Sequence, residues 1–358
     1  MHNHTIRPQK RLLWIDLIKI FSIFFVIVLH VNNIVLAEWN SIPVWWRISS
    51  NLYRSISVIA VPLFILASGQ LLLDKKESYV DFFYKRVRRI ILPWLGWALF
   101  YFIWTIFIES KSIGNLNEAV SLLCYILFNF YWFIPMIAGL YFLTPLLRVF
   151  IKAATKKDLY YFVSIWFLIF SIIFFFQQFF NVIIIPDLRQ KMLFLSIPYS
   201  GYFILGYLIT KTLSFKISYK KIVLLYIITI LATFFCTFFT SQANSLLRNN
   251  FFDYMAPNII IQTGVFFSLF SYQHKKIFSI TPFLKLIIMN ISKMSLGIYL
   301  SNKLIMDLVT SGLFSFKLDV LGFSPIFSVP LISLIVFLLS CILISCLRKI
   351  PFLKYFVT

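Results

Sequence analysis

Ten long apolar segments are the strongest constraint on what this chain can fold into. Each has about 18 to 25 residues, enough for a helix rising about 1.5 Å per residue to cross a hydrocarbon core about 30 Å thick. They lie at residues 13–37, 54–73, 90–108, 132–151, 159–180, 193–210, 221–240, 255–272, 287–309 and 325–347. Because 61% of the 358 residues are hydrophobic, a soluble domain could not bury this much apolar surface. The sequence therefore predicts an all-α polytopic membrane protein with about ten transmembrane helices.

The placement of basic residues tests this number of spans. With a cytoplasmic N-terminus, 23 of the 33 lysines and arginines fall in inner segments and 6 in outer loops. Cytoplasmic loops of membrane proteins carry such an excess, and one missed span would exchange inner and outer for every later loop. We therefore expect both termini to be cytoplasmic. The apolar but interrupted region 118–131 is expected to be an interfacial or re-entrant segment on the outer side.

The net charge of +21 does not indicate a nucleic-acid partner, because the basic residues lie between the apolar segments. The lipid bilayer is the expected partner instead. The four cysteines, Cys124, Cys236, Cys341 and Cys346, lie within or beside apolar segments and form no CxxC motif. Neither a disulfide framework nor a metal site is predicted from them. The first apolar segment is about twice the usual length of a signal peptide's apolar region, so we expect an uncleaved helix.

The first apolar segment contains three ionisable residues, Asp16, Lys19 and His30. Each costs roughly 2.5 to 3.5 kcal/mol in a bilayer, so such groups usually face a protein interior or a wet cavity. Separations of three and eleven residues place all three on one helix face, with His30 about 16 Å along the axis from Lys19. His30 is the one histidine in a predicted span, and an imidazole can accept and return a proton near neutral pH. His30 is therefore the candidate general base; an interfacial Asp16–Lys19 ion pair and a structural histidine remain alternatives.

Six short motifs follow one another along most of the chain. They are D-x-x-K-x(10)-H at 16–30, VPLFILASG at 61–69, KRVRRIILPW at 85–94, YWFIPMIAGLYFLTPLLR at 131–148, GYFILGYL at 201–208 and SKMSLGIYLSN at 292–302. Together they resemble the acyltransferase 3 family, integral-membrane enzymes that acylate surface polysaccharides. The resemblance implies one acyltransferase domain over residues 1–358, with a core of about 11–347, in the cytoplasmic (inner) membrane of a bacterium.

The resemblance also implies a reaction and roles for particular residues. An acyl group, usually acetyl, would pass from a cytoplasmic acyl-CoA such as acetyl-CoA to a hydroxyl of a cell-surface polysaccharide or lipid-linked glycan, with no bound cofactor. For such a reaction, His30 could act as the base, either directly on the acceptor or through a relayed acyl group. Lys19 or a helix-borne amide could stabilise the developing oxyanion, and Asp16 would keep Lys19 charged and in place. Arg86 and Arg89, one helical turn apart, would bind the donor phosphates. A plain positive-inside signal or anionic-lipid binding explains the two arginines equally well.

Four further residues are expected to line the path of the acceptor: Trp132, Tyr141, Tyr299 and Asn302. Interfacial anchoring is the alternative for Trp132 and Tyr141, and packing and hydrogen bonding between helices is the alternative for Tyr299 and Asn302.

Three positions depart from the family pattern. Lys19 stands where the family has arginine, which keeps the charge but loses bidentate geometry. Phe130 or Tyr131 stands where histidine often precedes the W-F pair, and Asn302 stands where histidine often follows G-I-Y-L. Asparagine forms hydrogen bonds but does not carry a proton near neutral pH. An exporter of a glycan or small solute, and an inactive scaffold in polysaccharide assembly, therefore remain alternative functions.

Overall fold

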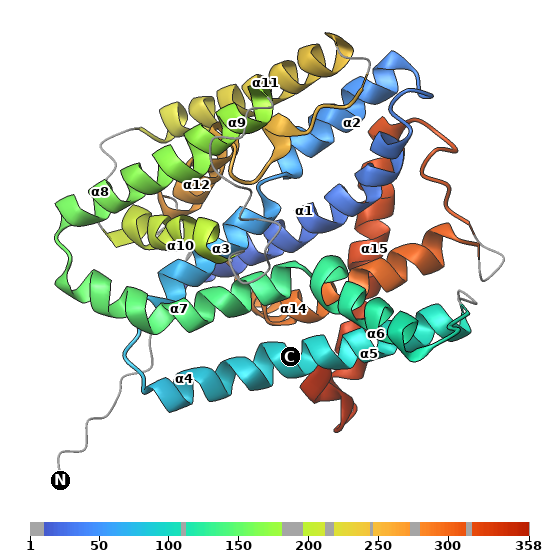
Figure 1. The fold of residues 1–358 in the computed structure, drawn as a ribbon, viewed down its shortest axis with the longest axis horizontal. Helices are drawn as coiled ribbons and strands as arrows, with labels where there is room; N and C mark the ends of the chain where they lie inside the picture. The colour runs from blue at the N-terminus through green and yellow to red at the C-terminus, as the bar shows by residue number, and fades with distance from the viewer. Residues whose placement is uncertain are drawn as a thin grey trace.

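The predicted all-α fold is confirmed. The computed structural model describes residues 11–108, 112–180, 196–211, 218–243, 246–272, 280–312 and 317–357, and over these residues it contains helices and no strand (Figure 1).

Eight of the ten predicted spans are helical segments of sufficient length and hydropathy to cross a membrane. These are α1 (Leu13–Ala37), α2 (Val44–Ser57) with α3 (Ala60–Leu72), α4 (Tyr79–Arg86) with α5 (Leu92–Phe107), α7 (Phe133–Ala153), α8 (Lys156–Phe167) with α9 (Phe174–Phe180), α11 (Tyr219–Ala243), α14 (Pro282–Thr310) and α15 (Pro325–Leu347). The other two, α10 (Ser196–Lys211) and α12 (Pro257–Tyr272), have 16 residues each. Over the predicted re-entrant region lies a short apolar helix, α6 (Leu116–Cys124), continued as a π-helix through Phe130.

Two helical segments begin about ten residues earlier than the apolar runs predicted. Helix α2 starts at Val44 because its polar residues Ser50, Asn51 and Ser55 are buried against protein rather than exposed to lipid. Helix α4 starts at Tyr79 within the predicted basic loop, where the Ser78 hydroxyl accepts a hydrogen bond from the Asp81 amide at 3.1 Å. Such an N-cap stabilises a helix start by about 1 kcal/mol.

Two prolines mark irregular points in these long segments. Pro62 cannot donate a hydrogen bond to the carbonyl of Val58, and the helix is interrupted between α2 and α3 at that point. Pro93 likewise leaves the carbonyl of Arg89 without its usual partner, and a π-helix spans Val87–Ile91 just before it.

Helix α1 lies at the centre of the assembly, packed against α2, α3, α12, α14 and α15 (Figure 1). Fifteen of its residues are buried, including Asp16, Ser22 and Asn32. The polar residues of the first predicted span therefore meet protein neighbours, as expected for ionisable groups within a membrane.

Helices α3 and α10 approach each other closely through two glycines. A Cβ atom on Gly69 would collide with the backbone carbonyl of Phe203, and one on Gly206 would collide with that of Leu66. Glycine at both positions permits this backbone contact, which is how small residues act between membrane helices. Gly69 of the VPLFILASG motif and Gly206 of the GYFILGYL motif are therefore needed for the close packing of α3 against α10.

Segments predicted to be cytoplasmic meet at one end of the helices. Lys211 Nζ lies 2.7 Å from Asp74 Oδ2, and Arg148 Nη2 lies 3.1 Å from Glu77 Oε1. At the other end, the Tyr53 hydroxyl donates to the Ile326 carbonyl at 2.6 Å. These contacts join predicted inner segments to one another and predicted outer segments to one another, and the side of the membrane that each end faces stays a prediction. Eight basic residues used for that prediction lie outside the described residues: Arg7, Lys10, Lys111, Arg189, Lys191, Lys216, Lys275 and Lys276.

Candidate active site

The His30 imidazole is hydrogen-bonded to Asn302, which comes from a helix far along the chain. His30 Nδ1 lies 2.8 Å from Asn302 Oδ1, joining α1 to α14. The amide nitrogen of Asn302 donates to the Tyr299 carbonyl at 2.6 Å. The predicted base and a predicted acceptor-lining residue are thus in direct contact.

These two hydrogen bonds determine which ring nitrogen of neutral His30 carries the proton. A backbone carbonyl can only accept, so the Asn302 amide nitrogen must face Tyr299 and its oxygen must face His30. That oxygen is also an acceptor, so Nδ1 of the imidazole must donate. The second nitrogen, Nε2, is then the unprotonated one, and it is the nitrogen able to accept a proton from a substrate.

His30 borders two cavities. One has a volume of about 380 Å³ and is lined by residues from several helices and the chain before α12, among them His30, Arg54, Trp132, Tyr254 and Tyr299. The second has a volume of about 360 Å³, and its lining includes His30, Tyr131, Tyr299, Asn302 and Lys303. The imidazole therefore faces space that a substrate group can enter, rather than dry packing on every side.

Three of the four predicted acceptor-lining residues surround His30, and the fourth does not. Trp132 stacks on Tyr254 with ring centroids 5.7 Å apart, in the larger cavity, and Tyr299 lines both cavities. Tyr141 lies elsewhere, with its ring 5.8 Å from the guanidinium carbon of Arg86. Tyr141 therefore belongs to the basic cluster at the predicted cytoplasmic end.

Asp16 is buried and pairs with Arg11 rather than directly with Lys19. Arg11 donates to both carboxylate oxygens of Asp16 at 2.7 and 2.9 Å, and Ser292 donates at 2.6 Å. This network ties the start of α1 to α14. Within the described part of the chain, Lys19 forms no hydrogen bond or ion pair, although Asp16 lies within electrostatic range. The predicted roles of Asp16 and Lys19 in the reaction stay predictions.

The predicted donor-binding arginines have different surroundings. Arg86 is largely buried, and its guanidinium carbon lies 4.0 Å from the ring centroid of Phe82. Its Nη1 lies 3.5 Å from Glu77 Oε1. Arg148 also lies over the ring of Phe82 at 4.6 Å, so two guanidinium groups contact this side chain. Arg89, in contrast, is exposed. The structure thus leaves Arg89 accessible and engages Arg86 in a network centred on Glu77.

Glu77 is a buried carboxylate surrounded by four cations. Its side chain is 5% exposed, and it forms ion pairs with Lys75, Lys85, Arg86 and Arg148. Burial raises the pKa of the Glu77 carboxyl, but hydrogen bonds from Arg148 and the lysines, together with the charge of Arg86, outweigh burial and lower the pKa to about 2. Because this pKa lies below the ordinary value of 4.5, Glu77 stabilises the fold above about pH 4.5 and loses this contribution as the pH falls toward 2.

We expect the Glu77→Gln substitution to destabilise the protein by about 2–4 kcal/mol at neutral pH, since it leaves Arg148 buried without its carboxylate. Thermal unfolding of the purified protein in detergent would measure the loss. The difference from wild type should shrink as the pH falls from 4.5 toward 2. Asp74→Asn is the matched control: its partner Lys211 is exposed, so the expected loss is under about 1 kcal/mol. Equal stability of Glu77→Gln and wild type at pH 7 would contradict this role.

Sequence reasoning missed several residues that the fold brings to these sites. Arg54 and Asp253 line the cavity of about 380 Å³ beside His30, and Glu77 and Arg148 form an ion pair in the basic cluster at the predicted cytoplasmic end. Arg54 was visible only as a charge at the edge of a predicted span. One sequence signal could have identified it: placing an arginine at the edge of a membrane span costs free energy unless the side chain binds a partner or a ligand.

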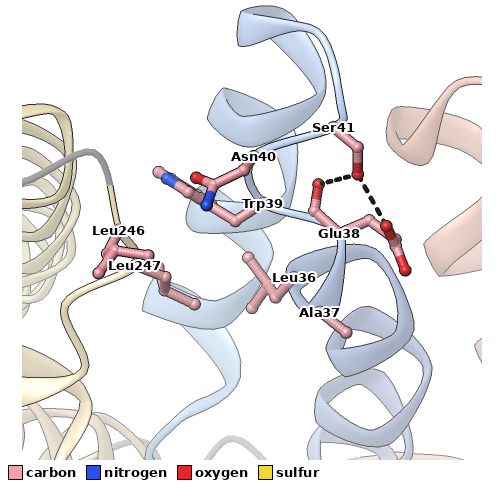
Figure 2. A pocket seen from close by; sticks show the side chains of 8 residues that line it. All are labelled: Leu36, Ala37, Glu38, Trp39, Asn40, Ser41, Leu246 and Leu247. Atoms are coloured by element: carbon pink, nitrogen blue, oxygen red, sulfur yellow. Dashed lines mark hydrogen bonds between the residues drawn. The ribbon is translucent and has the colours of Figure 1, made fainter.

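A wider hollow at the far end of α1 offers no comparable chemistry. It has a volume of about 630 Å³ and lies between the residues after α1 and the pair Leu246 and Leu247. Figure 2 shows the Glu38 carboxylate turned away from these leucines toward Ser41, whose hydroxyl donates to Glu38 Oε2 at 2.7 Å. The Glu38 carboxylate of this hollow is therefore directed toward Ser41 rather than toward the leucines.

Comparison with known proteins assigns the family. The model of the acyltransferase 3 family, described as an acyltransferase domain, matches residues 12–345, which is nearly the whole chain. No curated protein and no solved structure matches. The matched range includes α1 with His30 and α14 with Asn302. The chain therefore belongs to the acyltransferase 3 family and is a multi-pass membrane acyltransferase.

Proposed function

We propose that this protein is an O-acyltransferase that moves an acyl group, most simply acetyl, from a cytoplasmic acyl-CoA to a hydroxyl of a cell-surface polysaccharide or lipid-linked glycan. The proposed location is the cytoplasmic membrane of a bacterium. The observation that carries the proposal is the His30–Asn302 pair, whose hydrogen bonds leave Nε2 unprotonated on an imidazole that lines two cavities. A hydroxyl is a poor nucleophile until a base removes its proton during attack, and His30 meets that need.

The reaction balances with His30 as the single proton carrier. Nε2 takes the proton of the acceptor hydroxyl as its oxygen attacks the thioester carbonyl, so a C–O bond forms. The tetrahedral intermediate then breaks its C–S bond, and the imidazolium returns the proton to the thiolate of CoA. Asn302 Oδ1 accepts the Nδ1 hydrogen in both protonation states, so the ring keeps one orientation throughout. Lys19 lines neither cavity and lies about 16 Å along the axis of α1 from His30, so its proposed role is long-range electrostatic stabilisation rather than direct contact with the oxyanion, and Asp16 is proposed to hold the local charge balance.

Donor recognition is proposed at the basic cytoplasmic cluster. The exposed Arg89 is free to contact the phosphates of acyl-CoA, whereas Arg86 would have to share its guanidinium between Glu77 and the donor. The cavities beside His30 have none of these arginines in their lining. The thioester end of the donor therefore has to extend from the cluster toward His30.

Mass spectrometry of envelope glycans from cells with and without the gene tests the proposal. We expect acyl esters to disappear from one glycan in the deletion strain while the amount of exported polymer stays normal. Restoring the gene should restore the esters. Polymer that accumulates inside the deletion strain would favour the exporter instead. Esters and polymer both unchanged would contradict O-acyl transfer to a glycan.

A further inference from the structure

Arg54 is a cation placed in the same cavity as the proposed base. It lies on α2, and its guanidinium nitrogen Nη1 donates a hydrogen bond to Asn33 Oδ1 at 2.9 Å. Asn33 follows His30 by three residues on α1, so the two lie about one helical turn apart. The guanidinium of Arg54 also lies over the ring of Phe252, 4.8 Å from its centroid. The cavity of about 380 Å³ is therefore lined by His30 and Arg54 together.

The guanidinium of Arg54 lacks an anionic partner in the described part of the chain. Its neighbours there include the neutral Asn33, the Phe252 ring and Tyr254, and its Nε is buried without a hydrogen bond. A cation held away from water is costly unless a counter-charge is supplied. Arg47, on the same helix, donates instead to the carbonyls of Ile42 and Asn40. Arg54 is thus the arginine of α2 that lines the cavity and keeps an Nε without a hydrogen bond.

The cavity opens among segments predicted to be on the outer side of the membrane. Asn249, Phe252 and Tyr254 come from the loop between α11 and α12, and Trp132 stands just before α7. The stacked rings of Trp132 and Tyr254 offer the flat apolar surface on which a sugar ring packs. The lining thus combines aromatic rings, amides, the guanidinium of Arg54 and the carboxylate of Asp253, which accepts a hydrogen bond from the Met255 amide at 2.8 Å. Arg54 is the group of this lining that attracts the anionic part of a sugar.

We propose that this cavity binds an acceptor sugar that carries a carboxylate or a phosphate, with Arg54 binding the anionic group and His30 facing the hydroxyl to be acylated. The acceptor enters from the outer side. This inference rests on the proposed function for the acyl-transfer step, but binding of an anionic glycoside does not require turnover. A bidentate, charge-assisted contact with Arg54 fixes the ring and so selects which hydroxyl reaches Nε2.

Three glycosides that differ at a single carbon test the proposal: methyl glucuronide, methyl glucoside 6-phosphate and methyl glucoside. Their binding to the full-length protein in nanodiscs is measured through tryptophan fluorescence, since Trp132 lines the cavity. We expect wild type to bind one or both anionic glycosides at least about tenfold more tightly than the neutral one. The better anionic ligand also distinguishes carboxylate from phosphate recognition.

Variants at Arg54 and Arg47 identify the group responsible. Arg54→Gln should lose the tenfold preference and leave binding of methyl glucoside unchanged, while Arg54→Lys should retain part of the preference because it keeps the charge. Arg47→Gln is the matched control, since it removes the same charge from the same helix outside the cavity, and its preference should equal that of wild type. Thermal unfolding confirms that each variant is folded.

The outcomes separate this inference from the proposed function. Equal affinity for charged and neutral glycosides, no binding of either anionic glycoside, or an unchanged preference in Arg54→Gln would overturn the role of Arg54. None of these results bears on acyl transfer, which the glycan analysis of the deletion strain measures independently. Conversely, intact anion preference with no loss of glycan esters in the deletion strain would retain the binding site and reject the reaction.

Discussion

Replacing His30 with glutamine should lower the rate of acyl transfer by about 10²–10⁴-fold, with a normal amount of folded protein in the membrane. Glutamine can occupy the space and form a hydrogen bond, but it cannot accept the proton of the acceptor hydroxyl. The loss should appear in kcat, because the cavity beside His30 keeps its other lining residues and the donor cluster is unchanged. The measurement is ester formation on the glycan, in cells and with the purified protein and acetyl-CoA.

Two comparisons make this result specific. His274→Gln removes another histidine, in a predicted cytoplasmic loop outside the described residues, and should leave the rate unchanged. Binding of the anionic glycosides to His30→Gln should stay within about twofold of wild type, because Arg54 is intact. Wild-type ester levels in the His30→Gln strain would show that another group takes the proton and would reject the mechanism.

Much of the fold was predictable because apolar length is set by bilayer thickness. Helix α1 has the predicted bounds of 13–37, and each predicted span corresponds to a helix. The start of α2 was not predictable from hydropathy, since Ser50, Asn51 and Ser55 are buried against other helices rather than in lipid. A window that scores residue type cannot distinguish those two kinds of burial, because the distinction depends on tertiary neighbours.

Site residues could be predicted where the signal lay within one segment of the sequence, and not where it depended on a contact between distant segments. His30 was identifiable because an ionisable group inside a span needs a reason to be there. Its pairing with Asn302 joins residues 272 positions apart, and spacing along a helix carries no information on such a contact. Tyr141 was grouped with Trp132 because both lie in one motif, but nine residues along a helix move Tyr141 about 13 Å toward the basic cluster that contains Arg86.

Asn302 stands where family members often have histidine, and the structure gives this asparagine a defined task. By donating to the Tyr299 carbonyl it presents its oxygen to Nδ1 of His30, which keeps Nε2 free of a proton in the neutral ring. Asn302 is therefore a positioning residue that acts through His30. A hydrogen-bond acceptor is what this position must supply, and proton transfer at Asn302 itself is not required.

Asn302→Leu should therefore reduce kcat by about 10²–10⁴-fold, with KM for acetyl-CoA unchanged, because without an acceptor the imidazole can adopt the wrong tautomer and rotate. Leucine has a similar volume, so loss of packing contributes little, and thermal unfolding checks this. Asn302→Asp restores an acceptor for Nδ1 and should recover at least tenfold of the lost kcat, although it forfeits the bond to Tyr299. A purely structural role predicts the reverse order, because leucine suits the apolar surroundings better than a buried carboxylate does. Equal activity of the leucine and aspartate variants would therefore show that the hydrogen bond to His30 does not govern the reaction.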